Sequence, residues 1–318
     1  MKTFIKKITY WSLLITIIYY CICLFPFFIF DSSYPIYKSH LEFIESKSAN
    51  ILFLGDSRVV SSINPNQISG SRNLALTGST PIDSYILLKK YLENNLKVNT
   101  IFMSYSWDRL GNVYYPELIT HRGVPYGLFK YCDFMEVLEK SKLIDEKFSK
   151  SIGLKYFFLA KTRSPIIISS YMRNFNFSNY ANNKSIYEKI NAQNGHITSV
   201  WSGDRNCINC RGFEANMEDF KIKPIYDFYL QEIIKLCISR DIRVIFETIP
   251  FNESSKINHN VKIQYQKYLK KLSLLYPKAE LNDIIFYYED TYFEDAHHMR
   301  PEGALKYSKY LDFKYFQY

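Results

Sequence analysis

The sequence predicts an α/β fold, a three-layer sandwich with a central parallel sheet, and three observations support this prediction. Short segments that are apolar along their whole length recur along the chain, amphipathic segments with helical spacing lie between them, and polar residues capable of chemistry follow the first and the last apolar segments. Uninterrupted apolar strands that alternate with helices are typical of a parallel sheet covered on both faces. A length of 318 residues and a hydrophobic fraction of 47% are sufficient for one large domain.

The first element is residues 8–30, a stretch without charged side chains that is long enough to cross a bilayer as a helix. Three lysines precede it and Asp31 follows it, so the positive-inside rule predicts a cytoplasmic N-terminus and a main domain outside the cytoplasm, in the periplasm or at the cell surface. The stretch is too long for the core of a signal peptide and lacks a small-residue cleavage site. We therefore expect residues 1–30 to form a short tail and an uncleaved single-pass membrane anchor.

The next elements are a polar connector with a short helix, expected at residues 31–48, and the α/β domain at residues 49–318. The predicted strands are residues 50–54, 73–76, 100–104 and 242–249, with a fifth at 283–287. The predicted helices are residues 81–94, 226–239, 261–275 and 301–311. The first helix begins at Pro81 and carries apolar side chains on one face, and the fourth strand ends before Pro250.

Residues 107–221 interrupt this alternation, because the segment is long, aromatic, rich in asparagine and weakly periodic. We interpret it as an insertion that caps the site within the same domain. It contains Cys207 and Cys210, whose spacing suits a local disulfide, a redox pair or half of a zinc site. No second pair with this spacing occurs in the sequence, so a local disulfide is the first expectation, two free thiols the second and a metal the third.

Charge and motifs exclude several classes of function. The net charge is +9, but the lysines are scattered and no nucleic-acid-binding motif is present, so we expect no nucleic-acid partner. A positive surface also suits anionic lipids or an anionic polymer. The many aromatic residues fit either an AT-rich genome or a surface that contacts sugars or a membrane. The sequence contains no zinc-protease motif, phosphate loop or dinucleotide glycine motif, so we expect no metal and no cofactor.

Two short motifs at opposite ends of the domain carry the chemistry. Gly55-Asp56-Ser57 follows the first predicted strand, and Asp295-x-x-His298 follows the last. A serine hydroxyl becomes a nucleophile when an imidazole takes its proton, and a carboxylate holds that imidazole in one tautomer. Because the carboxyl ends of parallel strands meet at one edge of the sheet, the two motifs can converge there. We predict Ser57 as nucleophile, His298 as base and Asp295 as the orienting carboxylate.

These motifs resemble those of the SGNH or GDSL-type hydrolase superfamily, in which Gly-Asp-Ser follows a strand and Asp-x-x-His precedes a glycine, here Gly303. The resemblance implies a flavodoxin-like sandwich with Ser57 as the nucleophile, and it selects His298 over the adjacent His297. It also implies that Gly78, in the match to a second motif of this superfamily, offers its backbone N–H to the oxyanion together with that of Ser57.

The match is incomplete at the third motif, where the superfamily carries an asparagine after a strand. Residues 104–108 read Ser-Tyr-Ser-Trp-Asp here, without asparagine. Ser106 is the candidate to line the site in its place, together with its neighbours Trp107 and Asp108, although an ordinary structural loop is an equal alternative. This departure favours a transferase-like branch over a lipase-like one.

Further candidates near the nucleophile are Asp56, as a side-chain anchor of its loop, and Arg58. Arg58 is expected either to contact an anionic substrate or to form a surface salt bridge, and we prefer the salt bridge. Three other histidines have no partner at a suitable spacing and are predicted to be surface residues: His121, His196 and His259.

The single-span layout is similar to that of exported relatives such as alginate acetylation proteins and teichoic acid D-alanyl transfer proteins. It implies a membrane-anchored serine O-acyltransferase or esterase that acts outside the cytoplasm on acyl groups, in the first place acetyl, of a cell-envelope glycan or polymer. The implied partners are the acylated glycan, the membrane and a multispan membrane acyltransferase. The alternative is a catalytically inactive module of the same fold that binds the glycan or the multispan partner.

Overall fold

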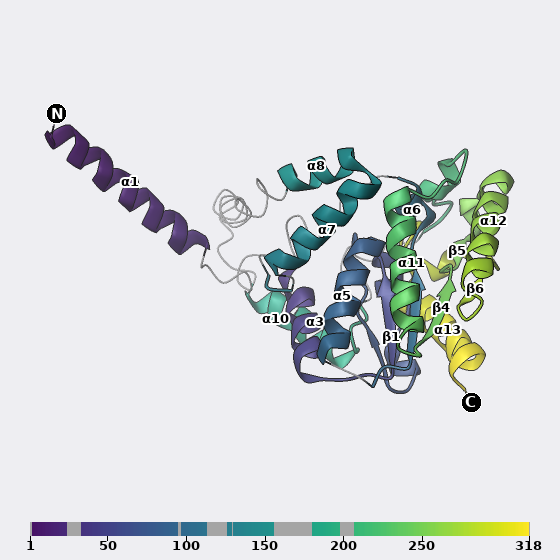
Figure 1. Ribbon diagram of the computed structural model, residues 1–318. Helices are drawn as coiled ribbons and strands as arrows, with labels where there is room; N and C mark the ends of the chain where they lie inside the picture. The colour runs from purple at the N-terminus through teal and green to yellow at the C-terminus, as the bar shows by residue number, and fades with distance from the viewer. Residues whose placement is uncertain are drawn as a thin grey trace.

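The computed structural model describes residues 2–23, 33–94, 97–112, 126–128, 130–155, 180–197 and 207–317 (Figure 1). At its centre is a five-stranded sheet in which all strand pairs are parallel, with helices packed against it. The predicted α/β fold with a central parallel sheet is confirmed.

The strand order of this sheet creates a crevice. The strands are β1 (Ile51–Gly55), β2 (Ser71–Asn73), β3 (Thr100–Ser104), β4 (Arg243–Glu247) and β6 (Glu280–Asn282). They lie in the order β2-β1-β3-β4-β6, so the chain first adds β2 on one side of β1 and then returns to add β3 on the other. In open α/β sheets such a reversal opens a crevice at the carboxyl ends of the two central strands, where ligands bind. The residues that follow β1 and β3 therefore flank the expected site.

Helices cover the two faces of the sheet. One face packs against α3 (Tyr34–Ser46), α5 (Pro81–Asn94), α11 (Pro224–Ile238) and α12 (His259–Leu275). The other packs against α4 (Ser57–Ser62) and α13 (Pro301–Leu311). Further helices are α6 (Trp107–Gly111) after β3, α7 (Tyr131–Ile144) beside α11, α8 (Glu146–Lys155) against α7, and α10 (Tyr180–Ala192) against α3. The short elements are β5 (Phe251–Asn252), which pairs with β7 (Tyr287–Tyr288), the 3-10 turns η1 (Pro65–Gln67), η4 (Phe213–Asn216), η5 (Glu253–Ser255) and η6 (Asp290–Tyr292), and the π-helix η7 (Asp312–Phe316).

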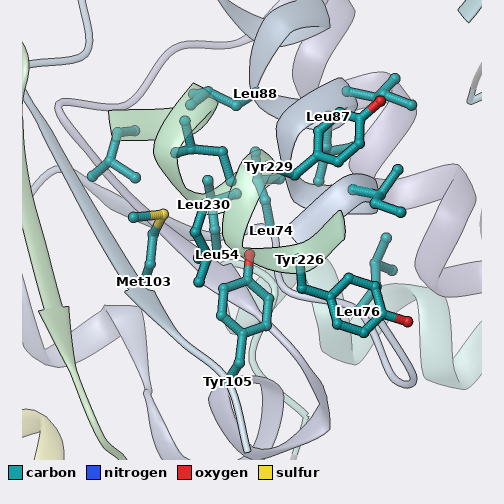
Figure 2. Packing of buried hydrophobic residues seen from close by; sticks show 14 of the residues in the cluster. Leu54, Leu74, Leu76, Leu87, Leu88, Met103, Tyr105, Tyr226, Tyr229 and Leu230 are labelled. Carbon is teal, nitrogen blue, oxygen red and sulfur yellow. The ribbon is translucent and has the colours of Figure 1, made fainter. Parts of the chain in front are cut away.

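Successive side chains of a strand point to opposite faces of the sheet and so pack into two separate hydrophobic cores. In β1, Leu54 points to the core beneath α5 and α11, whereas Phe53 points to the core beneath α4 and α13, and both are fully buried. Figure 2 shows Leu54 in one cluster with Met103 of β3 and with Tyr229 and Leu230 of α11. Burial of one such side chain is worth about 1.5–3 kcal/mol, so these contacts hold the helices on the sheet and fix the strand ends that carry the site.

Two predicted strands differ most from the observed ones, while those at 50–54 and 242–249 shift by one or two residues at their ends. The strand predicted at 73–76 is β2, which ends at Asn73. Leu74 N–H and Leu76 N–H still donate to carbonyl oxygens of β1, at 2.9 and 3.2 Å, so this part of the chain stays beside β1 without regular strand geometry. The fifth strand is β6 rather than residues 283–287. An edge strand is half exposed and less apolar, so the hydrophobic pattern pointed to the wrong segment.

The N-terminal segment forms α1 (Lys2–Cys23), which lies apart from the α/β body in Figure 1. Residues 24–30 of the span predicted at 8–30 lie outside the described part of the chain. Within the described part, no helix combines the length and the hydrophobicity needed to cross a membrane. The predicted membrane span is thus not confirmed.

Candidate active site

The turn after β1 brings Ser57 to the carboxyl edge of the sheet. Gly55 has a φ of +149°, and a Cβ there would lie 2.1 Å from the carbonyl oxygen of the last residue of β3, so this close approach requires glycine. Asp56 Oδ1 accepts the N–H of Arg58 at 3.0 Å and caps α4, while Oδ2 accepts the N–H of Ser106 at 2.8 Å. One buried carboxylate therefore ties the loops after β1 and β3 together and fixes the start of α4, whose first residue is Ser57.

A tight loop before α13 carries the aspartate and the imidazole. Phe293 and Met299, both buried, form an antiparallel bridge at its base, and Glu294 N–H donates to the carbonyl oxygen of His298 at 2.9 Å. Gly303 in the first turn of α13 approaches the end of η6 so closely that a Cβ would lie 2.6 Å from a carbonyl oxygen there. The glycine of the motif is therefore needed for the packing that holds this loop in place.

The side chains of Ser57, His298 and Asp295 form a continuous hydrogen-bonded row. His298 Nε2 lies 2.9 Å from Ser57 Oγ, and Nδ1 lies 2.8 Å from Asp295 Oδ2 and 3.0 Å from Oδ1. An ionised carboxylate can only accept, so Nδ1 carries the proton and Nε2 can accept the proton of the serine hydroxyl. The structure thus brings together the three residues predicted from the two distant motifs.

The carboxyl group of Asp295 is held in its ionised form. Burial would raise its pKa, but the hydrogen bond and charge of His298, together with the N–H groups of His297 and His298 at 2.8 and 2.9 Å, lower the pKa well below its ordinary value. A carboxylate that is ionised at neutral pH keeps the imidazole in the tautomer that the row requires.

A second polar network lies beside this row. The guanidinium of Arg58 donates through Nη2 to Glu214 Oε2 and to His297 Nδ1, both at 2.6 Å, and the side chains of Arg58 and Glu214 are 5% and 1% exposed. Arginine can only donate, so His297 is neutral with its proton on Nε2. Burial, followed by the charge of Arg58, lowers the pKa of His297 to about 3. His297 is thus bound to Arg58, whereas His298 faces Ser57.

Both networks border one pocket of about 370 Å³ at the crevice, within the size range of small-molecule sites. Its lining residues are Asp56, Ser57, Arg58, Thr77, Ser106, Asp108, Arg109, Phe213, Glu214, His297 and His298. From the second motif it is Thr77 that lines the pocket, and the neighbouring Gly78 adopts a φ of +77°. Ser106 lines it as predicted, and its Oγ accepts the N–H of Arg109 at 3.4 Å, which leaves the hydroxyl proton for another acceptor.

No protein-family profile matches this chain, and no curated protein is similar to it in sequence. The functional argument therefore depends on the fold and on the geometry of the pocket.

Two polar residues differ from expectation. Arg58 forms a salt bridge, but the pair is buried rather than on the surface, because its partner Glu214 comes from the predicted insertion. His196 is buried as well, with Nδ1 2.9 Å from the carbonyl oxygen of Val60, and burial lowers its pKa to about 4. His259 is exposed, as predicted, and His121 lies outside the described residues.

The predicted local disulfide is wrong, because Cys207 and Cys210 are free thiols in the structure. Cys207 is buried in an apolar cluster, where it packs as a small hydrophobic residue and where burial raises its pKa to about 12. Asn252 Nδ2 donates to the carbonyl oxygen of Cys210 at 2.6 Å and so holds the segment without a covalent link. Within the described residues, no cluster of three or more His, Cys, Asp or Glu side chains is arranged to hold a metal ion.

Sequence reasoning missed Phe213 and Glu214, the two pocket residues contributed by η4. They lie in the predicted insertion at 107–221, where no periodicity marks a strand or helix, and a single glutamate carries no signal of burial. Trp107 was a candidate for the site but is fully buried in the core, stacked on Tyr265.

Proposed function

We propose that this protein is a membrane-anchored serine O-acyltransferase or esterase of the SGNH type, which acts outside the cytoplasm on acyl groups, in the first place acetyl, of a cell-envelope glycan or polymer. The observation that carries the proposal is the hydrogen-bonded row of Asp295, His298 and Ser57 at the crevice of the sheet. A serine with an imidazole nitrogen at 2.9 Å, itself oriented by a carboxylate, is the arrangement that activates an oxygen nucleophile.

The topology supports the SGNH assignment. The order β2-β1-β3-β4-β6 corresponds to the doubly wound, flavodoxin-like order 2-1-3-4-5 once the strands of the main sheet alone are counted. The proposed nucleophile follows the first strand, and Asp295 and His298 precede α13, the last α-helix, as in the motifs that the sequence resembles.

The proposed reaction has two steps. Ser57 Oγ attacks the acyl carbonyl carbon while its proton passes to His298 Nε2. The ester C–O bond then breaks, and His298 returns the proton to the leaving alcohol, which leaves the acyl group on Ser57. In the second step a sugar hydroxyl or water attacks the carbonyl carbon of the acyl-enzyme and gives its proton to His298. The bond between the acyl carbon and Ser57 Oγ then breaks, and His298 returns the proton to Ser57. Asp295 stabilises the imidazolium in both steps.

Stabilisation of the oxyanion is assigned to the N–H of Ser57 and the hydroxyl of Ser106. Ser57 is the first residue of α4, so its N–H has no acceptor within the helix. The N–H of Ser106 is already bound to Asp56, whereas its hydroxyl proton is not. In this proposal Ser106 takes the role that an asparagine has in the superfamily. A donation from Gly78 stays a prediction.

Location and partners rest on the sequence pattern. The uncharged residues 8–30, preceded by lysines, support a single-pass anchor with the main domain outside the cytoplasm. A substrate in the cell envelope and a multispan membrane acyltransferase as acyl donor would both be within reach of such a domain. Retention of the full chain in the membrane fraction after a carbonate wash, with protease access to the domain from outside, tests this assignment. Release by the wash would refute it.

The catalytic proposal is tested by turnover of p-nitrophenyl acetate and by acetyl release from acetylated glycans. We expect Ser57→Ala and His298→Ala to abolish both activities, because each removes one end of the proton relay. Ser239→Ala and His259→Ala, which change an exposed serine and an exposed histidine, are the matched controls and should retain both. A folded wild-type protein without either activity would instead indicate the inactive binding module.

A further inference from the structure

The candidate pocket has one apolar wall, formed by Phe213. Among the described residues that line the pocket, all others carry polar or charged side chains. Phe213 is 64% exposed, although it belongs to a turn whose next residue, Glu214, is fully buried. An exposed aromatic ring beside these polar and charged side chains has no part in the proton relay, so it requires a separate explanation.

The ring of Phe213 is held in a defined position. It stacks on the imidazole of His297 with the ring centroids 5.0 Å apart and an angle of 17° between the ring planes. His297 is in turn bound to Arg58 at 2.6 Å, and Arg58 is bound to the buried Glu214 at the same distance. The phenyl ring is thus held through His297 by Arg58, the residue next to Ser57. The exposed part of the ring remains accessible to a ligand. A rigid aromatic side chain binds a ligand with little loss of conformational entropy.

The pocket favours a ligand with one flat apolar face and polar edges. A long acyl chain would need several apolar side chains along its length, whereas the described lining of this pocket offers one, Phe213. A pyranose ring has C–H groups on its faces and hydroxyls around its edge, so it can stack on Phe213 and meet polar side chains at the same time. We propose that Phe213 is the stacking platform for a pyranose ring of the substrate, and that it gives preference for sugar esters over simple esters. This inference rests on the proposed function and names its substrate class.

The kinetic test compares two substrates of the full-length protein: a pool of mono-O-acetylated cellobiose isomers and p-nitrophenyl acetate. Phe213→Ala should lower the ratio of kcat/KM for the sugar ester to that for the simple ester roughly tenfold to thirtyfold, the size expected from loss of one buried ring face. Phe213→Trp should preserve the ratio, and Phe213→Leu should lower it, because leucine is apolar but not flat. Phe313→Ala removes a phenylalanine that is 75% exposed and does not line the pocket, so it is the control and should leave the ratio unchanged.

A binding measurement separates this inference from the catalytic proposal. In the Ser57→Ala background, the Kd of the acetylated cellobiose pool, measured by saturation-transfer NMR, should rise roughly tenfold to thirtyfold when Phe213→Ala is added. Sugar binding that depends on Phe213 without any ester turnover by the wild type would refute the catalytic proposal and retain the platform.

Three results would overturn the platform: an unchanged ratio in Phe213→Ala, equal performance of Phe213→Leu and Phe213→Trp, or a larger loss for p-nitrophenyl octanoate than for the sugar ester. The last result would assign the ring to an acyl chain. Absence of sugar binding by the Ser57→Ala variant would overturn it as well.

Discussion

Replacement of Glu214 by alanine is expected to lower the free energy of unfolding by about 3–5 kcal/mol. Arg58 and Glu214 are 5% and 1% exposed and are joined at 2.6 Å, so the variant would leave the Arg58 charge in the protein interior without a counterion. Within the part of the chain that the structure describes, the other contacts of the guanidinium are the neutral His297 and the ring of Phe251 at 5.0 Å, and neither carries a negative charge. Most of the expected loss is therefore the desolvation penalty of an unpaired guanidinium.

Urea unfolding measures this effect. With a slope of about 3 kcal/mol/M, the transition midpoint of Glu214→Ala should fall by roughly 1–2 M. The double variant Arg58→Met/Glu214→Leu removes both charges, so it should lose much less stability than the sum of Arg58→Met and Glu214→Leu. Glu146→Ala is the matched control, because its partner Lys150 and Glu146 itself are 74% and 60% exposed and such surface pairs are worth about 0–1 kcal/mol. A loss in Glu214→Ala as small as that of the control, or additive single and double variants, would refute the reasoning.

Three further predictions concern protonation, catalysis and thiol reactivity. Three histidines have pKa values that burial lowers from 6.5: His40 to about 3, His196 to about 4 and His297 to about 3. Below about pH 6.5 the unfolded chain binds a proton at each of these histidines and the folded chain does not. The free energy of unfolding should therefore fall as the pH is lowered from 6 to 4, by up to about 4 kcal/mol per pH unit. A flat profile in urea titrations over this range would contradict the burial. Asp295→Asn should lower kcat for p-nitrophenyl acetate roughly 10⁴-fold in steady-state kinetics, since the amide favours the wrong tautomer of the imidazole; a loss under tenfold would remove Asp295 from the row. Iodoacetamide should modify the exposed Cys132 in the native protein and Cys207 only after unfolding, and detection of a Cys207–Cys210 disulfide by mass spectrometry would argue against the structure.

The sequence predicted those elements best in which the spacing of apolar residues and the residues at the ends indicate the same structure. The helices at 81–94 and 301–311 have the predicted bounds, because each begins at a proline and carries apolar side chains at helical spacing. The strand β3 was predicted to the residue, since a central strand is apolar on both faces. The edge strand β6 was missed for the opposite reason, as its side chains are half exposed and partly polar.

The candidate site likewise has a part that the sequence predicted and a part that it did not. Proximity of Ser57 to His298 followed from topology, because both lie beyond carboxyl ends of parallel strands. The partners Glu214 and Phe213 could not be predicted, since their place depends on contacts of a non-periodic segment with Arg58 of α4 and with His297 of the loop before α13. The burial of Arg58 follows from the same contacts. Because no sequence pattern indicates these contacts, the sequence predicted a salt bridge on the surface.

The most direct measurement is covalent labelling of the full-length protein with a fluorophosphonate, with the modified peptide identified by mass spectrometry. We predict one adduct, on Ser57, formed at least 100-fold more slowly in His298→Ala because the hydroxyl then lacks its base, and at the wild-type rate in His259→Ala. A folded protein that stays unmodified at Ser57, or whose labelling rate is insensitive to His298→Ala, would contradict the activation of this serine.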